Sequence, residues 1–491
     1  MQNYLTDASN MPGGYADRLV VPESISDISG VLREANEAGV AVTIAGARTG
    51  TVGGAVPFGG VVLSLEKLNR IKSIDKAGLS AVVEPGVVLA DFQKAVEAEG
   101  LFYPPDPTEW SCQVGGTVAT NASGSRSFKY GATREFVTGL KIVLADGELL
   151  NLKRGSAFSA DGKEVRVVSE SGRSIAARVS SYRRPDVRKN VSGYYNAEPL
   201  DAIDLFIGSE GTLGVITEIE LRLLPKPEGF FSGIIFFERT DKLLAFVDEV
   251  RLLSFENRKG PVAIAPGSDV DASLIEYFDD RALSFISEKF PETPSGMAGA
   301  IFFEQETTAE TEDSLFEQWN ALLEKHNADI DRSWFTTTEQ DREKMRAFRH
   351  ALPVSVNERV VRNKQKKIGT DMAVPDENFA GFLKFYKETL DASGIDYVIF
   401  GHIGDCHLHA NLLPKDEAEA ERSRHLYGRF IAQALMLGGT ISAEHGVGKL
   451  KSKYLNVMMG ERYMNEMAEL KKAFDPKGIL GRGNLFGVGS V

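Results

Sequence analysis

Cysteine is scarce in this sequence. The 491 residues include two cysteines, Cys112 and Cys406, and neither lies in a CxxC pair or in the spacing of an iron–sulfur cluster. Any redox chemistry must therefore come from a bound organic cofactor or from a metal without thiolate ligands. Low cysteine use also fits a reducing compartment, so we expect a cytoplasmic protein.

Long apolar runs and an excess of positive charge are also missing. No uncharged stretch approaches the roughly 20 residues that cross a bilayer, and the first 14 residues lack the pattern of a signal peptide. We expect no transmembrane segment, while attachment to a membrane surface stays open. Lysine and arginine number 56 against 69 aspartates and glutamates, a net charge of −13 that would repel a phosphate backbone. Nucleic acid is therefore excluded as an expected partner.

Glycine, by contrast, is plentiful. There are 48 glycines, and three glycine-rich stretches lie in the first half, at 46–54, 114–124 and 207–214. Backbone N–H groups bind phosphate where glycine lets the chain approach closely, so these stretches suit one diphosphate. Neither a P-loop nor a GxGxxG motif after a strand is present. Glycines that only make turns are the alternative.

The length indicates more than one domain, because one hydrophobic core stops growing at roughly 250–300 residues. Helical spacing predicts helices near 25–38, 89–98, 241–253, 308–326 and 416–437, and β-branched runs predict strands such as 40–44, 233–237 and 300–303. The stretch 225–229 (Pro-Lys-Pro-Glu-Gly) is a linker candidate. We divide the chain at residues 1–225, 226–455 and 456–491, the last being a helical tail that packs near the first domain.

Three of the seven histidines fall within eight residues: His402, His407 and His409. A strand at 397–400 followed by a two-residue turn at Gly404-Asp405 would pair residue 402 with residue 407. Side chains alternate along strands, so the three imidazoles and Asn411 would then share one face, whereas a three-residue loop would separate them.

Such a face suits a borderline divalent metal, for which Glu444 could be a third ligand. We expect a helix over 421–436 to end at Gly438-Gly439 and residues 440–442 to return as a strand. This path would bring Glu444 close to the histidines. The alternative is a set of hydrogen-bonded imidazoles without a metal, which is our interpretation of His326 and His425.

The first half resembles the FAD-binding domain of the vanillyl-alcohol-oxidase/p-cresol-methylhydroxylase superfamily over residues 4–225. The matching motifs are Ala45-Gly-Ala-Arg-Thr-Gly-Thr-Val-Gly-Gly, Val83-Glu-Pro-Gly, Gly115-Gly-Thr-Val-Ala-Thr-Asn, Lys129-Tyr-Gly and Gly208-Ser-Glu-Gly-Thr-Leu-Gly-Val-Ile-Thr. The resemblance implies a p-cresol-methylhydroxylase-type FAD-binding domain of the α+β class. It implies cofactor contacts from Gly46, Arg48, Thr49, Gly50, Gly53, Gly54, Gly115, Gly116, Thr117, Asn121, Tyr130, Gly131, Glu210, Gly214 and Ile216.

The FAD is expected to be non-covalent. No histidine precedes His326, which excludes a histidyl link from this domain. Cys112 fits a small core residue better than a cysteinyl link.

The second half resembles the α+β C-terminal FAD-linked oxidase domain of D-lactate, glycolate and D-2-hydroxyglutarate dehydrogenases. Their motifs H-x-G-D-G-N-x-H and E-H-G-x-G match residues 402–409 and 444–448, except that Cys406-His407 replaces Gly-Asn. The resemblance implies metal ligands at His402, His409 and Glu444, a catalytic base at His445, and substrate contact by Asn411. Arg349 would clamp a carboxylate, with Lys367 a further substrate contact. His407 would be an added ligand or polar substrate contact.

The resulting hypothesis is a flavin-dependent dehydrogenase. It would oxidise a small D-2-hydroxy acid (D-lactate or D-2-hydroxyglutarate) to the 2-oxo acid with the help of zinc, or of manganese or iron. Electrons would pass to an external acceptor, a quinone, an electron-transfer flavoprotein or a cytochrome. The alternatives are a glycolate oxidase FAD subunit, a metal-dependent hydrolase that uses the His/Glu site, and a flavin protein like the alkyl-dihydroxyacetone-phosphate synthases. Whether the chain forms a homodimer is left open.

Overall fold

The computed structural model describes residues 1–159, 162–259, 269–336 and 338–487. Its first half consists of η1 (Gln2–Tyr4), β1 (Arg18–Val20), α1 (Ile25–Ala38), β2 (Val42–Ala45), β3 (Val61–Ser64), β4 (Ile71–Asp75), β5 (Ser80–Val83), α2 (Leu89–Ala98), β6 (Leu101–Phe102), α3 (Val114–Thr120), α4 (Ser127–Tyr130), η2 (Thr133–Phe136), β7 (Val137–Val143), β8 (Leu149–Lys153), β9 (Glu164–Val168), β10 (Ser174–Arg178), α5 (Ile203–Phe206), β11 (Val215–Arg222) and β12 (Leu224–Pro225).

The second half consists of β13 (Gly229–Phe237), α6 (Thr240–Arg258), β14 (Ala272–Asp279), α7 (Asp280–Ser287), β15 (Gly299–Thr307), α8 (Glu312–Lys325), β16 (Asp329–Phe335), α9 (Glu339–Asn363), β17 (Ile368–Gly369), η3 (Asp376–Asn378), α10 (Phe379–Ser393), β18 (Tyr397–Gly401), η4 (Ile403–Asp405), β19 (His409–Leu412), α11 (Glu417–Met436) and α12 (Ser452–Phe474).

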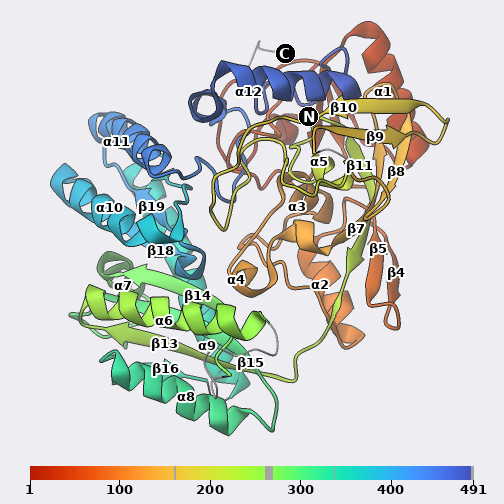
Figure 1. Cartoon of the computed structure of the whole chain (residues 1–491). Helices are drawn as coiled ribbons and strands as arrows, with labels where there is room; N and C mark the ends of the chain where they lie inside the picture. Colours follow the sequence, from red (N-terminus) through yellow and green to blue (C-terminus); the bar gives the residue numbers. More distant parts are fainter. Residues whose placement is uncertain (160–161, 260–268, 337, 488–491) are drawn as a thin grey trace.

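The two halves have different sheets, which Figure 1 shows on opposite sides of the molecule. Within the described residues, the first half has a parallel three-stranded sheet, β1-β3-β2, and an antiparallel five-stranded sheet, β4-β5-β11-β7-β8. The second half is built on a sheet in the order β16-β13-β15-β14-β18-β19-β17, whose paired strands are all antiparallel. The chain crosses from β12 to β13, and α12 returns to lie beside β10 of the first half.

Local sequence signals account for most of the long helices. Helix α1 begins at a capping box made by Ser24 and Asp27 and ends at Gly39, whose φ of 68° is the left-handed conformation that glycine adopts without strain. The helices expected near 89–98, 241–253, 308–326 and 416–437 are confirmed as α2, α6, α8 and α11. The mixed α+β fold class is also confirmed.

The second glycine-rich stretch contains helix α3, in which Gly115 packs tightly against Pro85; a Cβ at Gly115 would lie 2.4 Å from that of Pro85. One local expectation is wrong. Residues 440–442 do not form a strand, and Thr440 makes a single bridge to Ala373. The backbone of this segment is held instead by side chains, which are described below.

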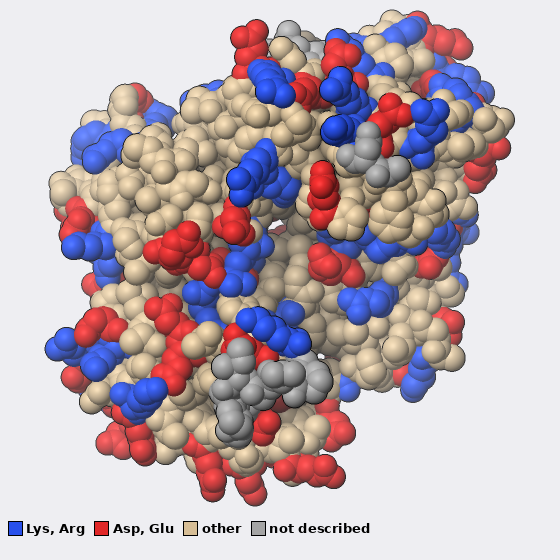
Figure 2. All heavy atoms as spheres, in the orientation of Figure 1, with Lys and Arg blue, Asp and Glu red and all other residues tan. Residues whose placement is uncertain are grey.

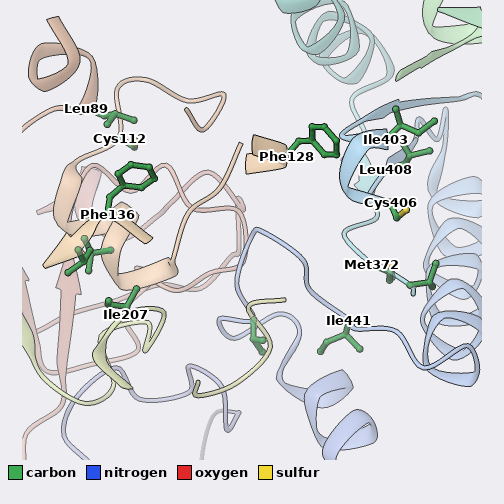
Figure 3. Close-up of a cluster of buried hydrophobic side chains, with 14 of the residues drawn as sticks. Leu89, Cys112, Phe128, Phe136, Ile207, Met372, Ile403, Cys406, Leu408 and Ile441 are labelled. Atoms are coloured by element: carbon green, nitrogen blue, oxygen red, sulfur yellow. The ribbon is translucent and has the colours of Figure 1, made fainter. Parts of the chain in front are cut away.

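The core is continuous across both halves. One cluster of buried side chains joins Leu89, Phe136 and Ile207 of the first half to Met372, Ile403 and Ile441 of the second. Figure 3 shows the ring of Phe128, from α4, directed at Ile403 and Leu408 in the turn that carries the histidines. The first half therefore packs directly on the segment that positions the second half's site.

Candidate active site

A cavity of about 830 Å³ lies between the halves, and Figure 2 shows the surface hollowed there. Its wall runs from the glycine loop 46–55 to His402, His409, Glu444 and His445. That volume lies in the upper part of the usual range for small-molecule and cofactor sites. The tertiary structure thus joins the glycine loops and the histidine cluster in one cavity.

Most of the residues expected to contact a cofactor lie on this wall. They are Gly46, Arg48, Thr49, Gly50, Gly54, Gly115, Gly116, Thr117, Glu210, Gly214 and Ile216. Four others lie away from it: Gly53, Asn121, Tyr130 and Gly131. Asn121 ends helix α3, where its side-chain oxygen accepts a hydrogen bond from Arg134 N, and Tyr130 packs against Phe102.

Two of the glycines on the wall leave space for a ligand's phosphates. A Cβ at Gly50 or Gly116 would meet no atom within 4 Å and would project into open space. Side chains at these positions would narrow the cavity and separate a ligand from the backbone. The open backbone at Gly50 and Gly116 therefore fits the diphosphate of FAD.

Glu210 ties the glycine loops to the second half. Its carboxylate accepts hydrogen bonds from the amides of Val447 and Gly448, at 2.7 and 2.6 Å, and burial raises its pKa despite these donors. Lys449 donates to the carbonyl of Gly53 at 3.2 Å and to Asn484 Oδ1 at 2.7 Å. Asn484 in turn donates to Gly54 O. These contacts make the 446–449 segment and the C-terminal turn a support for the glycine loop.

The histidines converge, but through a different turn from the one expected. Residues 403–405 form the 3-10 turn η4, and Cys406 has a φ of 52°, so the connection is longer than a two-residue hairpin loop. The strand register is nevertheless the one that the two-residue loop would impose, with Phe400 opposite His409 and Val398 opposite Asn411. The predicted turn is wrong and the predicted register is confirmed.

Glu444 lies at the centre of the histidine cluster. Its Oε2 lies 3.2 Å from His402 Nε2, 3.5 Å from His409 Nε2 and 3.9 Å from His407 Nδ1. Its Oε1 points away and accepts hydrogen bonds from Lys189 Nζ at 2.7 Å and Ser123 Oγ at 2.9 Å. The carboxylate is thus held from the first half with one oxygen free to bind a cation.

A second carboxylate orients His402. Glu276 contacts His402 Nδ1 through a short hydrogen bond and faces Arg349 at 3.2 Å. Burial alone would raise the pKa of Glu276, but His402 and Arg349 bring it to about 2. Burial likewise opposes protonation of His402, yet Glu276 and Glu444 raise its pKa to about 9. Two carboxylates around one imidazole therefore make this point favourable for positive charge.

Asp371, which is fully buried, organises the segment that carries Glu444 and His445. It accepts hydrogen bonds from the amides of both residues, at 3.2 and 3.1 Å, and from Ser442 Oγ and Lys451 Nζ. Burial would raise its pKa, but the neighbouring His445 and Lys451 hold it well below its ordinary value. This ionised carboxylate fixes the backbone where the expected strand is absent.

His445 lies on the cavity wall, with its ring stacked on that of His409 at a centroid distance of 5.1 Å. Its Nδ1 faces Asp371 Oδ2 at 3.5 Å. Burial lowers the pKa of His445 to about 4, although Asp371 opposes this shift. This shift favours the neutral imidazole, which can accept a proton.

Of the residues expected to contact substrate, two line the cavity and two do not. Arg349 and Lys367 line the cavity, together with the apolar side chains of Phe278, Pro353 and Phe400. Asn411 is buried away from the wall, and its amide donates to His409 O at 3.4 Å. His407 is fully buried and is also not on the wall. The cavity's histidine end thus offers two cations and an apolar surface.

Sequence reasoning missed the residues that hold the site: Ser123, Lys189, Glu276 and Asp371. One weak signal was Thr370-Asp371, a polar pair directly before the apolar Met-Ala-Val, which is unusual for a surface loop. Lys189 stands in the basic stretch 183–189, where nothing distinguishes it from its solvated neighbours. The signal for Glu276, a charge within the apolar run 272–278, is equally weak.

Comparison with protein families identifies two matching models. Residues 16–153 match the FAD binding domain model, and residues 262–485 match the model of the C-terminal domain of FAD linked oxidases. The first match includes the glycine loop 46–54 and residues 115–117, and the second includes His402, His409, Glu444 and His445.

Several named proteins are similar over nearly the whole chain. A glycolate oxidase subunit, GlcD, of Bacillus subtilis (strain 168) is 30% identical over 98% of this chain and 92% of its own length. A D-lactate dehydrogenase of Anaerostipes hadrus is 32% identical over 95% and 89%. A D-2-hydroxyglutarate dehydrogenase of Stutzerimonas stutzeri (strain A1501) is 28% identical over 95% and 90%.

Among solved structures, 4-ethylphenol oxidase from Gulosibacter chungangensis, in its isoeugenol complex, has a similar fold. The TM-score is 0.67 at 19% identity, over 99% of this chain and 92% of the oxidase chain. At that identity the match supports the fold alone.

Proposed function

This chain belongs to the family of FAD-linked oxidases and is an FAD-dependent oxidoreductase, and from that premise we propose that it oxidises a small D-2-hydroxy acid to the 2-oxo acid. The relatives named for D-lactate, D-2-hydroxyglutarate and glycolate share this chemistry of substrate, a carboxylate beside a carbon that bears a hydroxyl. The observation that carries the proposal is the single cavity that joins the glycine loops to His402, His409, Glu444 and His445.

The glycine loops would hold FAD non-covalently. We assign this role to the wall residues of 46–54, 115–117 and 210–216. They belong to a first domain of residues 1–225, which is followed by a substrate domain of residues 226–455 and a helical tail of residues 456–491. When bound, FAD supplies the acceptor for the two electrons and the hydrogen that leave the substrate's C2.

Among the described helices, none is long and apolar enough to cross a membrane.

A divalent metal would bind to His402, His409 and Glu444. The donor set supports it: one carboxylate oxygen faces two imidazole nitrogens at 3.2 and 3.5 Å, and the site favours positive charge. Zinc suits these ligands, with manganese or iron as alternatives. When bound, the ion would act as a Lewis acid on the substrate's carboxylate and 2-hydroxyl.

His445 would be the general base. Its Nδ1 faces the ionised carboxylate of Asp371, which leaves Nε2 to accept the proton of the 2-hydroxyl. As Nε2 takes up that proton, the negative Asp371 stabilises the resulting imidazolium. Asp371 also fixes the backbone of His445, so one carboxylate both orients and supports the base.

Arg349 and Lys367 would bind negative groups of the substrate. Arg349 is partly neutralised by Glu276, while Lys367 makes no side-chain hydrogen bond or ion pair with any described residue. Burial alone lowers the pKa of Lys367, and a substrate carboxylate beside it would reverse that shift. This arrangement supports D-2-hydroxyglutarate, with its second carboxylate, as well as D-lactate.

The test is an anaerobic visible spectrum of the FAD-loaded protein, recorded before and after addition of D-lactate, D-2-hydroxyglutarate or glycolate. Loss of the flavin bands near about 450 nm with a D-acid, but not with its L-isomer, is the expected result. A flavin that none of these acids reduces would refute the substrate class while leaving the family assignment intact. Reduction by glycolate alone would favour the second candidate, a glycolate oxidase FAD subunit, which the similarity to GlcD supports.

A further inference from the structure

His407 stands where the family motif has asparagine, and the structure gives it an arrangement like that of the two proposed histidine ligands. Each of the three imidazoles directs one ring nitrogen outward to an oxygen: His402 to Glu276, His409 to the carbonyl of Thr370 at 2.9 Å, and His407 to Asp371 Oδ1 at 3.3 Å. An outer acceptor of this kind fixes the orientation of a metal-binding imidazole.

The other nitrogen of each ring faces the same oxygen. His407 Nδ1 lies 3.9 Å from Glu444 Oε2, compared with 3.2 Å for His402 and 3.5 Å for His409. Metal–ligand bonds of 2.0–2.2 Å in a tetrahedron place ligand atoms roughly 3.4 Å apart. All four donor atoms lie within 4.8 Å of one another, so inward movements of about 1 Å would complete a tetrahedron.

The environment of His407 does not fit the other roles open to it. The side chain is fully buried and lies off the cavity wall, which argues against contact with substrate. Its Nδ1 makes no hydrogen bond to any described residue, and its Nε2 approaches Asp371 Oδ1 at 3.3 Å without the alignment of a full hydrogen bond, although a buried unsatisfied polar atom costs about 1–3 kcal/mol. A core histidine without a ligand would ordinarily have satisfied at least one of them.

We infer that His407 Nδ1 is a fourth protein ligand of the divalent ion, an inference that rests on the metal site of the proposed function. The site then presents three imidazole nitrogens and one carboxylate oxygen. Such a set selects zinc, iron, cobalt or nickel over magnesium and calcium.

The experiment compares three variants of the FAD-loaded protein. His407→Asn restores the residue of the family motif, and His409→Asn removes one of the three metal ligands in the proposed function. His425→Asn is the control, because it changes an exposed histidine on α11. Zn²⁺ affinity is measured by competition with a chromophoric chelator after the protein has been stripped of metal. The visible spectrum of the Co²⁺-loaded protein reports coordination number, and flavin absorbance reports folding.

We expect His407→Asn to weaken Zn²⁺ binding by about 100-fold or more, beyond what loss of an outer-shell partner causes, and to change the Co²⁺ spectrum. His425→Asn should leave both unchanged. If His409→Asn weakens binding while His407→Asn stays within about threefold of the wild type with an unaltered Co²⁺ spectrum, the fourth ligand is refuted and the proposed metal site stands. If the wild type binds neither Zn²⁺ nor Co²⁺, both are refuted.

A measurement on the unmodified protein covers the case in which His407→Asn fails to fold. X-ray absorption at the zinc edge distinguishes three imidazole ligands from two by their outer-shell scattering. Three imidazoles support the inference, and two overturn it.

Discussion

At the scale of single residues, His445 is the group on which the proposed chemistry depends most. Replacing His445 with glutamine keeps a polar side chain but removes the base, so the rate of flavin reduction by the D-acid should fall by about 10²–10⁴-fold. Stopped-flow absorbance measures this rate in single turnovers. His425→Gln, on the exposed face of α11, is the control and should reduce at the wild-type rate. A His445→Gln protein that holds FAD and reduces it at a normal rate would remove His445 from the mechanism.

Gly448 is a residue at which no side chain fits. Its φ is +50°, and a Cβ there would lie 2.2 Å from the carbonyl oxygen of Val52, in the glycine loop. Gly448→Ala should therefore push the loop away from the 446–448 segment and lower FAD affinity at least tenfold, besides destabilising the fold by a few kcal/mol.

The matched control is Gly428→Ala, in the middle of α11, where a Cβ meets nothing within 4 Å. This substitution should raise the free energy of unfolding by up to about 1 kcal/mol, because alanine favours a helix over glycine. Fluorescence titration with FAD and thermal denaturation measure both effects. Equal FAD affinity in the two variants would contradict the packing argument.

At the scale of the element, the end of β14 and the start of α7 depend on one buried carboxylate. Asp279 caps α7 by accepting a hydrogen bond from Ala282 N at 2.7 Å, and its other oxygen makes no full hydrogen bond to a described residue. Burial raises its pKa to about 7. The native state therefore holds the proton more tightly than the unfolded chain, whose aspartate titrates near 3.9. The contribution of protonated Asp279 to the free energy of unfolding is therefore fully present below about pH 4 and is lost as the pH rises to about 7.

Asp279→Asn should remove that dependence while keeping the cap, because the asparagine side-chain oxygen can accept the same hydrogen bond. Its free energy of unfolding should match the wild type near pH 4 and exceed it by roughly 1–4 kcal/mol at pH 8. Denaturant titrations at pH 5, 6, 7 and 8 measure the difference. Asp241→Asn, in the exposed first turn of α6, should leave the pH profile unchanged. A constant difference across pH would show that Asp279 is ionised throughout.

At the scale of the whole molecule, the halves are joined by a shared core as well as by the cavity. Phe128, from α4, is 5% exposed, lies 5.2 Å from the ring of Phe255, and would be 2.9 Å from a Cβ at Gly404. Figure 3 shows it against the turn that carries His402 and His407. The first half thus supports the histidine end of the cavity.

Phe128→Ala should cost about 3–5 kcal/mol and weaken Zn²⁺ binding, because the turn loses its support. Calorimetry and the chelator competition measure the two effects together. Phe158→Ala, whose side chain is 56% exposed, should cost less than about 1 kcal/mol and leave the metal site intact. A Phe128→Ala protein with unchanged Zn²⁺ affinity would mean that the turn keeps its shape without the first half.

The sequence by itself determined the elements, the family and the composition of the site. Helical spacing, capping residues and β-branched runs act over a few residues, so α1, α2, α6, α8 and α11 were predictable. The motifs around Gly46, Gly115 and Gly208 led to the FAD-linked oxidases, and the spacing of His402, His407 and His409 led to a shared face. The register Phe400 to His409 also followed from local pairing.

Only the tertiary structure decided which distant residues position the side chains of the site. Glu444 reaches the histidines because Asp371 holds its backbone, and its second oxygen is held by Lys189 and Ser123, which lie 255 and 321 residues earlier. In the structure, the side chains of His407 and Asn411 are buried and do not line the cavity. The physical reason is range: strand and helix periodicity depend on adjacent residues, whereas the direction of a buried polar side chain depends on which distant group satisfies it.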